Sequence, residues 1–160
     1  MLARPCPECG FDAASVHGRD VASILPGLAD RWVAVLRTAD ATLRPAAAVW
    51  SPTEYACHIR DVLTLFAERA RSMLESDDPA FTDWDQDETA LEERYWEQEP
   101  AVVGGQLLAA AQTATSVFGG VPDDGWSRPG RRSNGSVFTV DALARYFVHD
   151  VVHHLHDVDG

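Results

Sequence analysis

At 160 residues, 46% hydrophobic and 24% charged, the chain has the composition of a single soluble globular domain. Its net charge of −12 argues against binding to a nucleic-acid backbone, and because all 13 basic residues are arginine, Schiff-base catalysis and a P-loop are excluded. No run approaches the ~18 apolar residues of a membrane span, and the N-terminus lacks the apolar core of a signal peptide. We therefore expect a cytoplasmic protein that binds neither nucleic acid nor membrane.

Residues 1–18 are predicted to form a leader that carries a Cys-x-x-Cys motif, Cys6 and Cys9, followed by Gly10. Three cysteines in a chain without a secretion signal make a disulfide framework unfavourable. The motif has the form of a zinc knuckle, but a complete structural site needs four ligands, and His17 is the one nearby candidate for a third. Structural zinc, a redox-active or free pair of thiols, and no shared role all stay open.

Residues 19–160 are predicted to form an all-α, four-helix bundle. Apolar residues recur at steps of three and four, which indicates helices with one buried face. The clearest start is Ser51, which can cap a helix, with Pro52 at its first position and Glu54 closing a capping box. The four predicted helices span residues 19–43, with a kink or a short lead-in helix expected at Pro26-Gly27, then 51–74, 101–118 and 139–158.

Two connecting segments separate these helices. The helix 2 to helix 3 connection is long and acidic over residues 76–100, with Trp84 and Trp96 embedded in it and a short helix expected near residues 86–95. We interpret it chiefly as a solvated connector, with an acidic binding surface as the alternative. Residues 119–138 are rich in turn residues, and a short hairpin is allowed within residues 126–138.

The histidines carry the chemical signal. His58 falls on the apolar stripe of the second helix, and His149 and His153 lie four residues apart on one side of the last helix, with His156 and Tyr146 sharing that side. Three neutral imidazoles suit zinc, nickel or iron and leave coordination positions open.

Two observations weaken this interpretation. A single histidine on an apolar face is more often a hydrogen-bonded core residue, and the strongest apolar face of the last helix lies opposite His149 and His153. The pair is then expected to line a cleft at the flank of the bundle. His154 and Asp150 point elsewhere, and His154 is predicted not to be a ligand. Asp61 or Asp150 could act as a base or orient a ligand.

Residues 50–61 and 138–153 resemble the second-helix and final-helix segments of the DinB-like (YfiT-like) superfamily of metal-binding four-helix bundles. The order and spacing of the helices between them are similar too, so that the likeness covers roughly residues 20–158. The chain resembles an actinobacterial type of member, and the leader with Cys6 and Cys9 departs from the minimal pattern of the family.

The resemblance implies a metal site made by His58, His149 and His153 with an open face, often in a homodimer. Several branches are thiol-dependent transferases that use bacillithiol or mycothiol, and a related branch contains mycothiol-dependent maleylpyruvate isomerases. A GC-rich coding bias, inferred from the alanine and arginine content, favours mycothiol. Zinc and nickel are the expected metals; Cys6, Cys9, His17 and His156 are secondary candidate ligands.

Three functions are compatible with these residues. The first is a metal-dependent S-transferase that joins a small-molecule thiol to an electrophile, with Arg128, Arg131, Arg132 and Tyr146 as candidate substrate-binding residues. For the arginines, the alternative is a solvated loop that counters an acidic protein. The second is a non-catalytic metal-binding or stress-responsive module. The third is a metal-dependent hydrolase.

Overall fold

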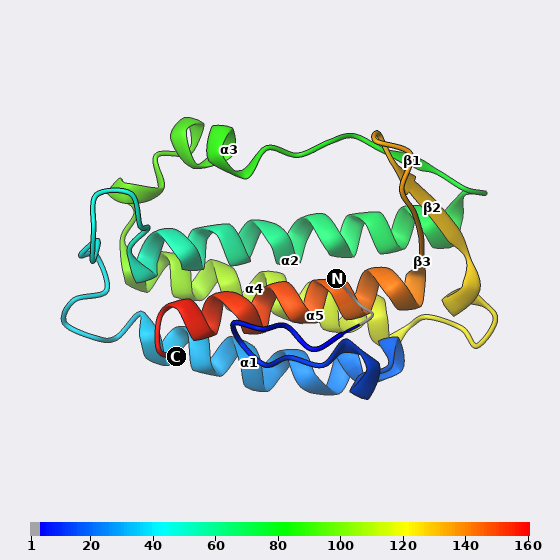
Figure 1. The fold of residues 1–160 in the computed structure, drawn as a ribbon, viewed down its shortest axis with the longest axis horizontal. Coiled ribbons are helices and arrows are strands. Elements are labelled where there is room, and N and C mark those ends of the chain that lie inside the picture. The colour runs from blue at the N-terminus through cyan, green and yellow to red at the C-terminus, as the bar shows by residue number, and fades with distance from the viewer. Residues whose placement is uncertain (1–3) are drawn as a thin grey trace.

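The computed structural model describes residues 4–160 and contains four long helices packed as a bundle (Figure 1). The predicted all-α four-helix bundle is confirmed, and a small sheet is added at one end. The short helix α3, Gln86–Glu92, lies in the long connection after the second long helix. The long helices are α1 (Val21–Val35), α2 (Pro52–Glu75), α4 (Pro100–Gly119) and α5 (Val140–Asp157).

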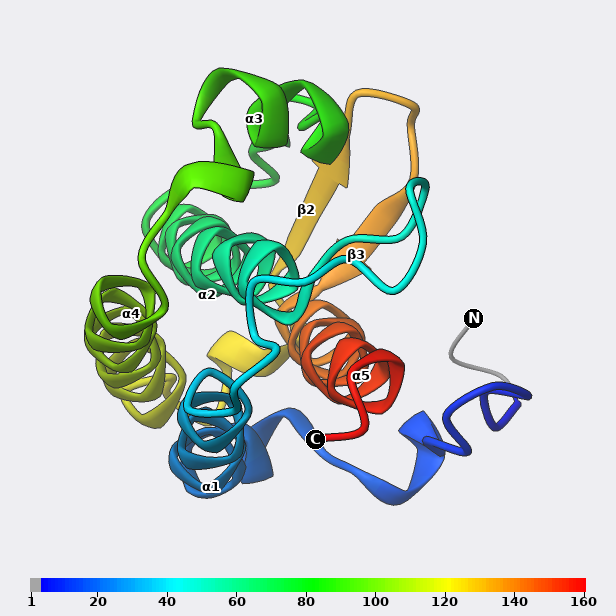
Figure 2. The same ribbon diagram turned by 90° about the vertical axis from the view of Figure 1, so that its left-hand side faces the viewer.

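The four helices are not arranged in simple chain order around the bundle. Both α1 and α2 pack against α4 and α5, so that α1 lies diagonally across from α2, and α4 across from α5 (Figure 2). The α1–α2 and α4–α5 connections therefore cross the ends of the bundle. As a result, the last helix is flanked by α1 and α2 in the bundle, and the leader lies on its remaining side.

The start of α2 forms as its sequence predicts. The Ser51 hydroxyl accepts a hydrogen bond from the Glu54 backbone N–H at 3.2 Å, and the Glu54 carboxylate accepts one from the Ser51 N–H at 2.8 Å. Glu54 is 1% exposed and pairs with the guanidinium of Arg44 in the preceding loop. A buried charge is tolerated here because its oxygens are hydrogen-bonded and its charge is paired.

The first helix ends earlier than predicted, at Val35 instead of residue 43. The Ala41 carbonyl accepts hydrogen bonds from the backbone N–H of Thr53, at 2.9 Å, and from its hydroxyl, at 2.8 Å. These contacts join the segment after α1 to the first turn of α2. Pro26 lies inside α1 without ending it.

The sheet has three short strands in the order β1-β2-β3, with β1 parallel to β2 and β2 antiparallel to β3. The β2–β3 hairpin lies in the region where the turn residues allow one, whereas β1 has no clear sequence signal. A side chain at position 130 would bring its Cβ within 2.8 Å of Met73 and Phe81, so glycine permits the close approach of β2 to α2. The strands are β1 (Ala80–Phe81), β2 (Pro129–Arg132) and β3 (Val137–Thr139).

Helix α4 has the length and the mean hydropathy, 1.2, of a helix that could cross a membrane. The sequence analysis did not single it out. In the structure it packs against α1 and α2, with Val103, Leu107 and Phe118 buried in the core. Its apolar character on that side is therefore accounted for by packing within the bundle.

The Arg44–Glu54 pair is expected to contribute to stability. Glu54→Gln keeps the shape of the capping box but removes the charge, and should lower the free energy of unfolding by about 1–2 kcal/mol at neutral pH. The exposed Glu92→Gln on α3 is the matched control and should change it by less than about 0.5 kcal/mol. Urea unfolding measures both.

The pH dependence of that difference follows from the pKa of Glu54. Burial raises this pKa, but Arg44 and Ser51 outweigh the burial and hold it below the ordinary value of 4.5. The stabilisation is therefore fully present above pH 4.5 and is lost as the pH falls below it. A difference between wild type and Glu54→Gln that grew on acidification would contradict this account.

Candidate metal centre

A cluster of three potential ligands lies between α2 and α5. The α2–α5 cluster consists of His58 from α2 with Asp150 and His154 from α5, and one ligand atom of each lies within 4.8 Å of the others. One Asp150 carboxylate oxygen is 3.7 Å from His58 Nε2, and the other is 3.8 Å from His154 Nε2. Because Asp150 and His154 are four residues apart, one turn of α5 presents both to α2.

The imidazole of His58 is deeply buried and unsatisfied. The residue is 1% exposed, and neither ring nitrogen has a hydrogen-bond partner among residues 4–160. The Trp84 ring stacks on it with centroids 5.4 Å apart and planes within 7°, and Trp50 lies 5.7 Å away on a tilted plane. A buried polar nitrogen left without a partner is costly, so this donor set fits a cation that would satisfy it.

The charge states at this cluster also suit a cation. Burial disfavours ionisation of Asp150, but the neighbouring His58, His154 and His149 outweigh it and hold the pKa of the carboxyl below its ordinary value. Burial, with His58 nearby, lowers the pKa of His154 although Asp150 opposes the shift. At neutral pH the site therefore offers a carboxylate beside a neutral imidazole, the forms in which both side chains bind metals.

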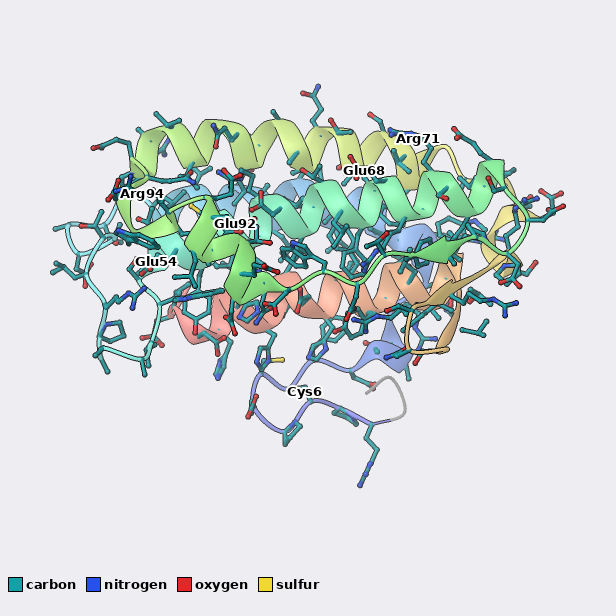
Figure 3. The ribbon with its side chains drawn as sticks, turned by 90° about the horizontal axis from the view of Figure 1, so that it is seen from above. Cys6, Glu54, Glu68, Arg71, Glu92 and Arg94 are labelled. Atoms are coloured by element: carbon teal, nitrogen blue, oxygen red, sulfur yellow. The ribbon has the colours of Figure 1, made fainter. Side chains whose placement is uncertain are left out.

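A second cluster lies on the other flank of α5. The α5–leader cluster consists of Cys6, Cys9, His149 and His153, again with ligand atoms within 4.8 Å of one another. Figure 3 shows Cys6 on the leader loop beside α5, on the side of that helix away from α2. The Cys6 sulfur is 3.7 Å from His153 Nδ1. A single helix thus contributes to two adjacent sets of ligands.

Two cavities border these clusters. The small cavity has a volume of about 110 Å³ and is lined by His58 and Asp150 of the α2–α5 cluster. The large cavity, of about 600 Å³, lies between the leader and α5. Tyr146 and Asp150 line both cavities and so stand between them. The small cavity is further enclosed by Phe66, Arg69, Phe81, Trp84, Gln86, Arg132, Phe138 and Leu143.

A family model for the DinB superfamily matches residues 25–158, most of the chain. The chain belongs to the DinB superfamily. The resemblance drawn from the two histidine-bearing segments is thereby confirmed.

The bundle is also similar to a solved structure, YfiT from Bacillus subtilis, which is described as a probable metal-dependent hydrolase with an unusual four-helix bundle topology. The TM-score is 0.71 and the sequence identity 17%, over 87% of this chain and 81% of that one. At this identity the likeness supports the fold alone. Comparison with curated proteins gave no match.

The three histidines expected from the DinB resemblance do not fall into one cluster. His58 lies with Asp150 and His154, whereas His149 and His153 lie with the leader cysteines. His154, predicted to point away from the site, is therefore a candidate ligand. The reason is the roll of α5: with its apolar face in the core, Asp150 and His154 at the edge of that face meet α2, and His149 and His153 turn further outward.

Of the four residues predicted to bind substrate, two line the small cavity and two do not. Arg132 and Tyr146 line the small cavity. Arg128 instead donates hydrogen bonds to the carbonyls of Met73, at 2.6 Å, and Ser76, and Arg131 pairs with Asp78 in the loop that follows α2. Their role is therefore to hold the sheet against the bundle.

Three further candidates lie outside both clusters as found among the described residues: His17, His156 and Asp61. His17 is exposed at the start of a short 3-10 helix, and His156 is exposed on α5. Asp61 accepts hydrogen bonds from Arg60, at 2.8 Å, and from the Tyr95 hydroxyl. The Asp61 carboxylate is therefore engaged in hydrogen bonds within the bundle and lies apart from both clusters.

Arg69 and Trp84 were not among the residues predicted from the sequence to form the site. The helical period places Arg69 about 20° from His58 on α2. Its position on the same face of the helix as His58 could therefore have been predicted. No comparable signal identified Trp84, because it belongs to an irregular segment. The acidic connector around it was interpreted as solvated, whereas its aromatic side chains close the small cavity.

The three cysteines should differ in reactivity. Backbone N–H groups of Cys9 and Glu8, with the His149 side chain, lower the pKa of Cys6 to about 6, whereas burial raises that of Cys57 to about 12. In chelator-treated protein, alkylation of Cys6 by iodoacetamide should speed up as the pH rises through about 6, because the thiolate is the nucleophile. Cys57 should react only after unfolding. Peptide mass mapping measures both, and a Cys6 midpoint near 9 would refute the assignment.

Proposed function

We propose that this protein is a metal-dependent enzyme that joins a small-molecule thiol to a small anionic electrophile. A divalent transition metal, zinc or nickel, would be held by His58, Asp150 and His154. The observation that carries the proposal is the buried imidazole of His58, which lines a cavity and whose two nitrogens have no hydrogen-bond partner in the described chain. When bound, such a metal would act as a Lewis acid and would make a thiol or water nucleophilic at neutral pH.

The small cavity is suited to an anion. Arg69 is 8% exposed, and one hydrogen bond, to the Thr82 carbonyl at 3.1 Å, engages its guanidinium. Arg132 lies 3.7 Å from the exposed Asp83, and its buried Nε is unpartnered within residues 4–160. Burial and the nearby Arg132 lower the pKa of Arg69. The guanidinium groups of Arg69 and Arg132 therefore have unused hydrogen-bond donors and little neighbouring negative charge. A carboxylate or phosphate group of the substrate would supply both the acceptors and the charge.

The walls of the cavity define the rest of the substrate. Phe66, Phe81, Trp84 and Phe138 line it, so an apolar or aromatic body would fit between the arginines and the α2–α5 cluster. Burial raises the pKa of Tyr146, and the Asp150 charge adds to this, so that the phenol keeps its proton. Tyr146 Oη–H is then a hydrogen-bond donor toward the electrophile.

We propose that the thiol binds in the large cavity. Tyr146 and Asp150 line both this cavity and the small cavity, so that the two reactants would lie on either side of the same pair of residues. We propose mycothiol as the thiol and the cytoplasm as the compartment. The sulfur forms a bond to the electrophilic carbon, the leaving group departs with its electron pair, and the thiol proton passes to solvent. Holding both reactants at one site is expected to supply much of the rate gain.

Hydrolysis is the second candidate. It needs one organic substrate and water, for which the small cavity is sufficient, and YfiT, whose bundle is similar, is described as a probable metal-dependent hydrolase. The two reactions are separated by assaying the same metal-loaded protein with mycothiol and chloronitrobenzoate, and with aromatic esters that carry a carboxylate. Chloride release that requires the thiol supports transfer; ester cleavage independent of thiol supports hydrolysis.

His58→Ala should remove one equivalent of metal and reduce the reaction to background, because it deletes the ligand from α2. His154→Ala, at a less buried position, should do the same with less effect on folding. The exposed His156→Ala is the matched control and should retain metal and activity. Metal analysis on protein without a His tag measures the first effect. Full metal content in both His58→Ala and His154→Ala would refute the proposed ligands.

Arg132→Gln should lower kcat/KM for chloronitrobenzoate by about 10- to 100-fold, because it removes a hydrogen bond to a charged group. Such a bond contributes about 1.5–3 kcal/mol. The neighbouring Arg131→Gln, which pairs with Asp78 instead, is the matched control. With uncharged chlorodinitrobenzene, both variants should stay within about threefold of wild type. An equal loss of kcat/KM for both electrophiles would show that Arg132 does not bind the carboxylate of the substrate.

A further inference from the structure

The leader contains a turn built like a metal-binding knuckle. The backbone N–H of Gly10 donates to the Cys6 carbonyl at 2.9 Å, and the Cys6 N–H donates to the Phe11 carbonyl at 2.8 Å. Gly10 has φ +72°, a conformation that glycine adopts without strain. This tight turn brings the sulfur atoms of Cys6 and Cys9 within 4.8 Å of each other.

Helix α5 presents two imidazoles to this turn. His149 is 9% exposed, and its Nε2 is buried with no hydrogen-bond partner in the described part of the chain. Phe11 of the leader stacks on its ring with centroids 5.3 Å apart. His153 places Nδ1 3.7 Å from the Cys6 sulfur and Nε2 3.4 Å from the Glu8 carboxylate.

We propose that Cys6, Cys9, His149 and His153 form a structural zinc site that fastens the leader to α5, separate from the α2–α5 cluster. Two thiolates and two imidazoles are a donor set that tetrahedral zinc prefers, and four protein ligands leave no coordination position open for a substrate. The two thiolates neutralise the ion.

The surroundings of the site match this role. The Glu8 carboxylate beside His153 Nε2 is the partner that orients a metal-bound imidazole and fixes which nitrogen carries the proton. Elsewhere the leader is held by isolated contacts, such as the hydrogen bond from Arg145 Nε to the Ala13 carbonyl at 2.7 Å. A metal that joins residues 147 positions apart in the chain would anchor it far more firmly.

Cobalt substitution tests the site, because a thiolate bound to Co²⁺ gives a charge-transfer band in the near ultraviolet. Full-length protein with a removed tag, loaded with Co²⁺, should show this band together with the visible bands of a tetrahedral ion. Cys6→Ser and Cys9→Ser should each lose the charge-transfer band and one equivalent of bound zinc in native mass spectrometry. The exposed His17→Ala and His156→Ala are the matched controls and should keep both.

The same measurements separate this site from the catalytic proposal. His58→Ala should keep the charge-transfer band and the leader zinc, and hydrogen exchange of residues 6–11 should slow upon zinc addition in wild type but not in Cys9→Ser. An absent charge-transfer band, or a zinc count unchanged in Cys6→Ser and Cys9→Ser, would overturn the proposal whatever the fate of the α2–α5 cluster.

Discussion

The burial of one face of α5 determines the arrangement of every ligand in this protein. Leu143, Phe147, Val151 and Leu155 lie along that face, and all four are at most 3% exposed. Because side chains of a helix point in directions fixed by its period, this single constraint directs the adjacent polar positions to two different neighbours. Asp150 and His154 meet α2, and His149 and His153 meet the leader. Packing energy, spread over the whole helix, thus positions groups whose own interactions are few.

The diagonal order of the helices makes this arrangement possible. Since α1 and α2 are not neighbours, α5 packs between them and has one flank left for a segment outside the bundle. The leader occupies that flank. In a bundle where each helix packed beside its successor, the last helix would have different neighbours, and the histidine-bearing turn would not be shared between α2 and residues near the N-terminus.

Much of the fold was accessible from the sequence. The start of α2 was predicted because Ser51, Pro52 and Glu54 act locally, within one turn. His58 and the histidines of α5 were recognised as chemically important for the same reason: helical spacing places them on defined faces.

What the sequence left unresolved depends on contacts between distant segments. The division of the histidines into two clusters depends on how α5 is rotated about its axis relative to α2, and helical periodicity gives only the angles between residues of one helix. The contact between Cys6 and His153 joins residues 147 positions apart. The two residues of β1 are too few to carry a pattern. Trp84 was missed because an irregular segment has no period from which its orientation can be calculated.

The connector between α2 and α4 has a consequence for how such a protein can diversify. It contributes Phe81, Trp84 and Gln86 to the wall of the small cavity, yet belongs to none of the four long helices, and its many acidic residues face water. Phe81 belongs to the hydrophobic core and Trp84 stacks on His58, but Gln86 is exposed, so substitutions at such exposed positions can reshape the chamber while leaving the interior and both ligand sets intact. Selectivity for different molecules could then evolve at the exposed positions of this segment, which the stability of the scaffold hardly constrains.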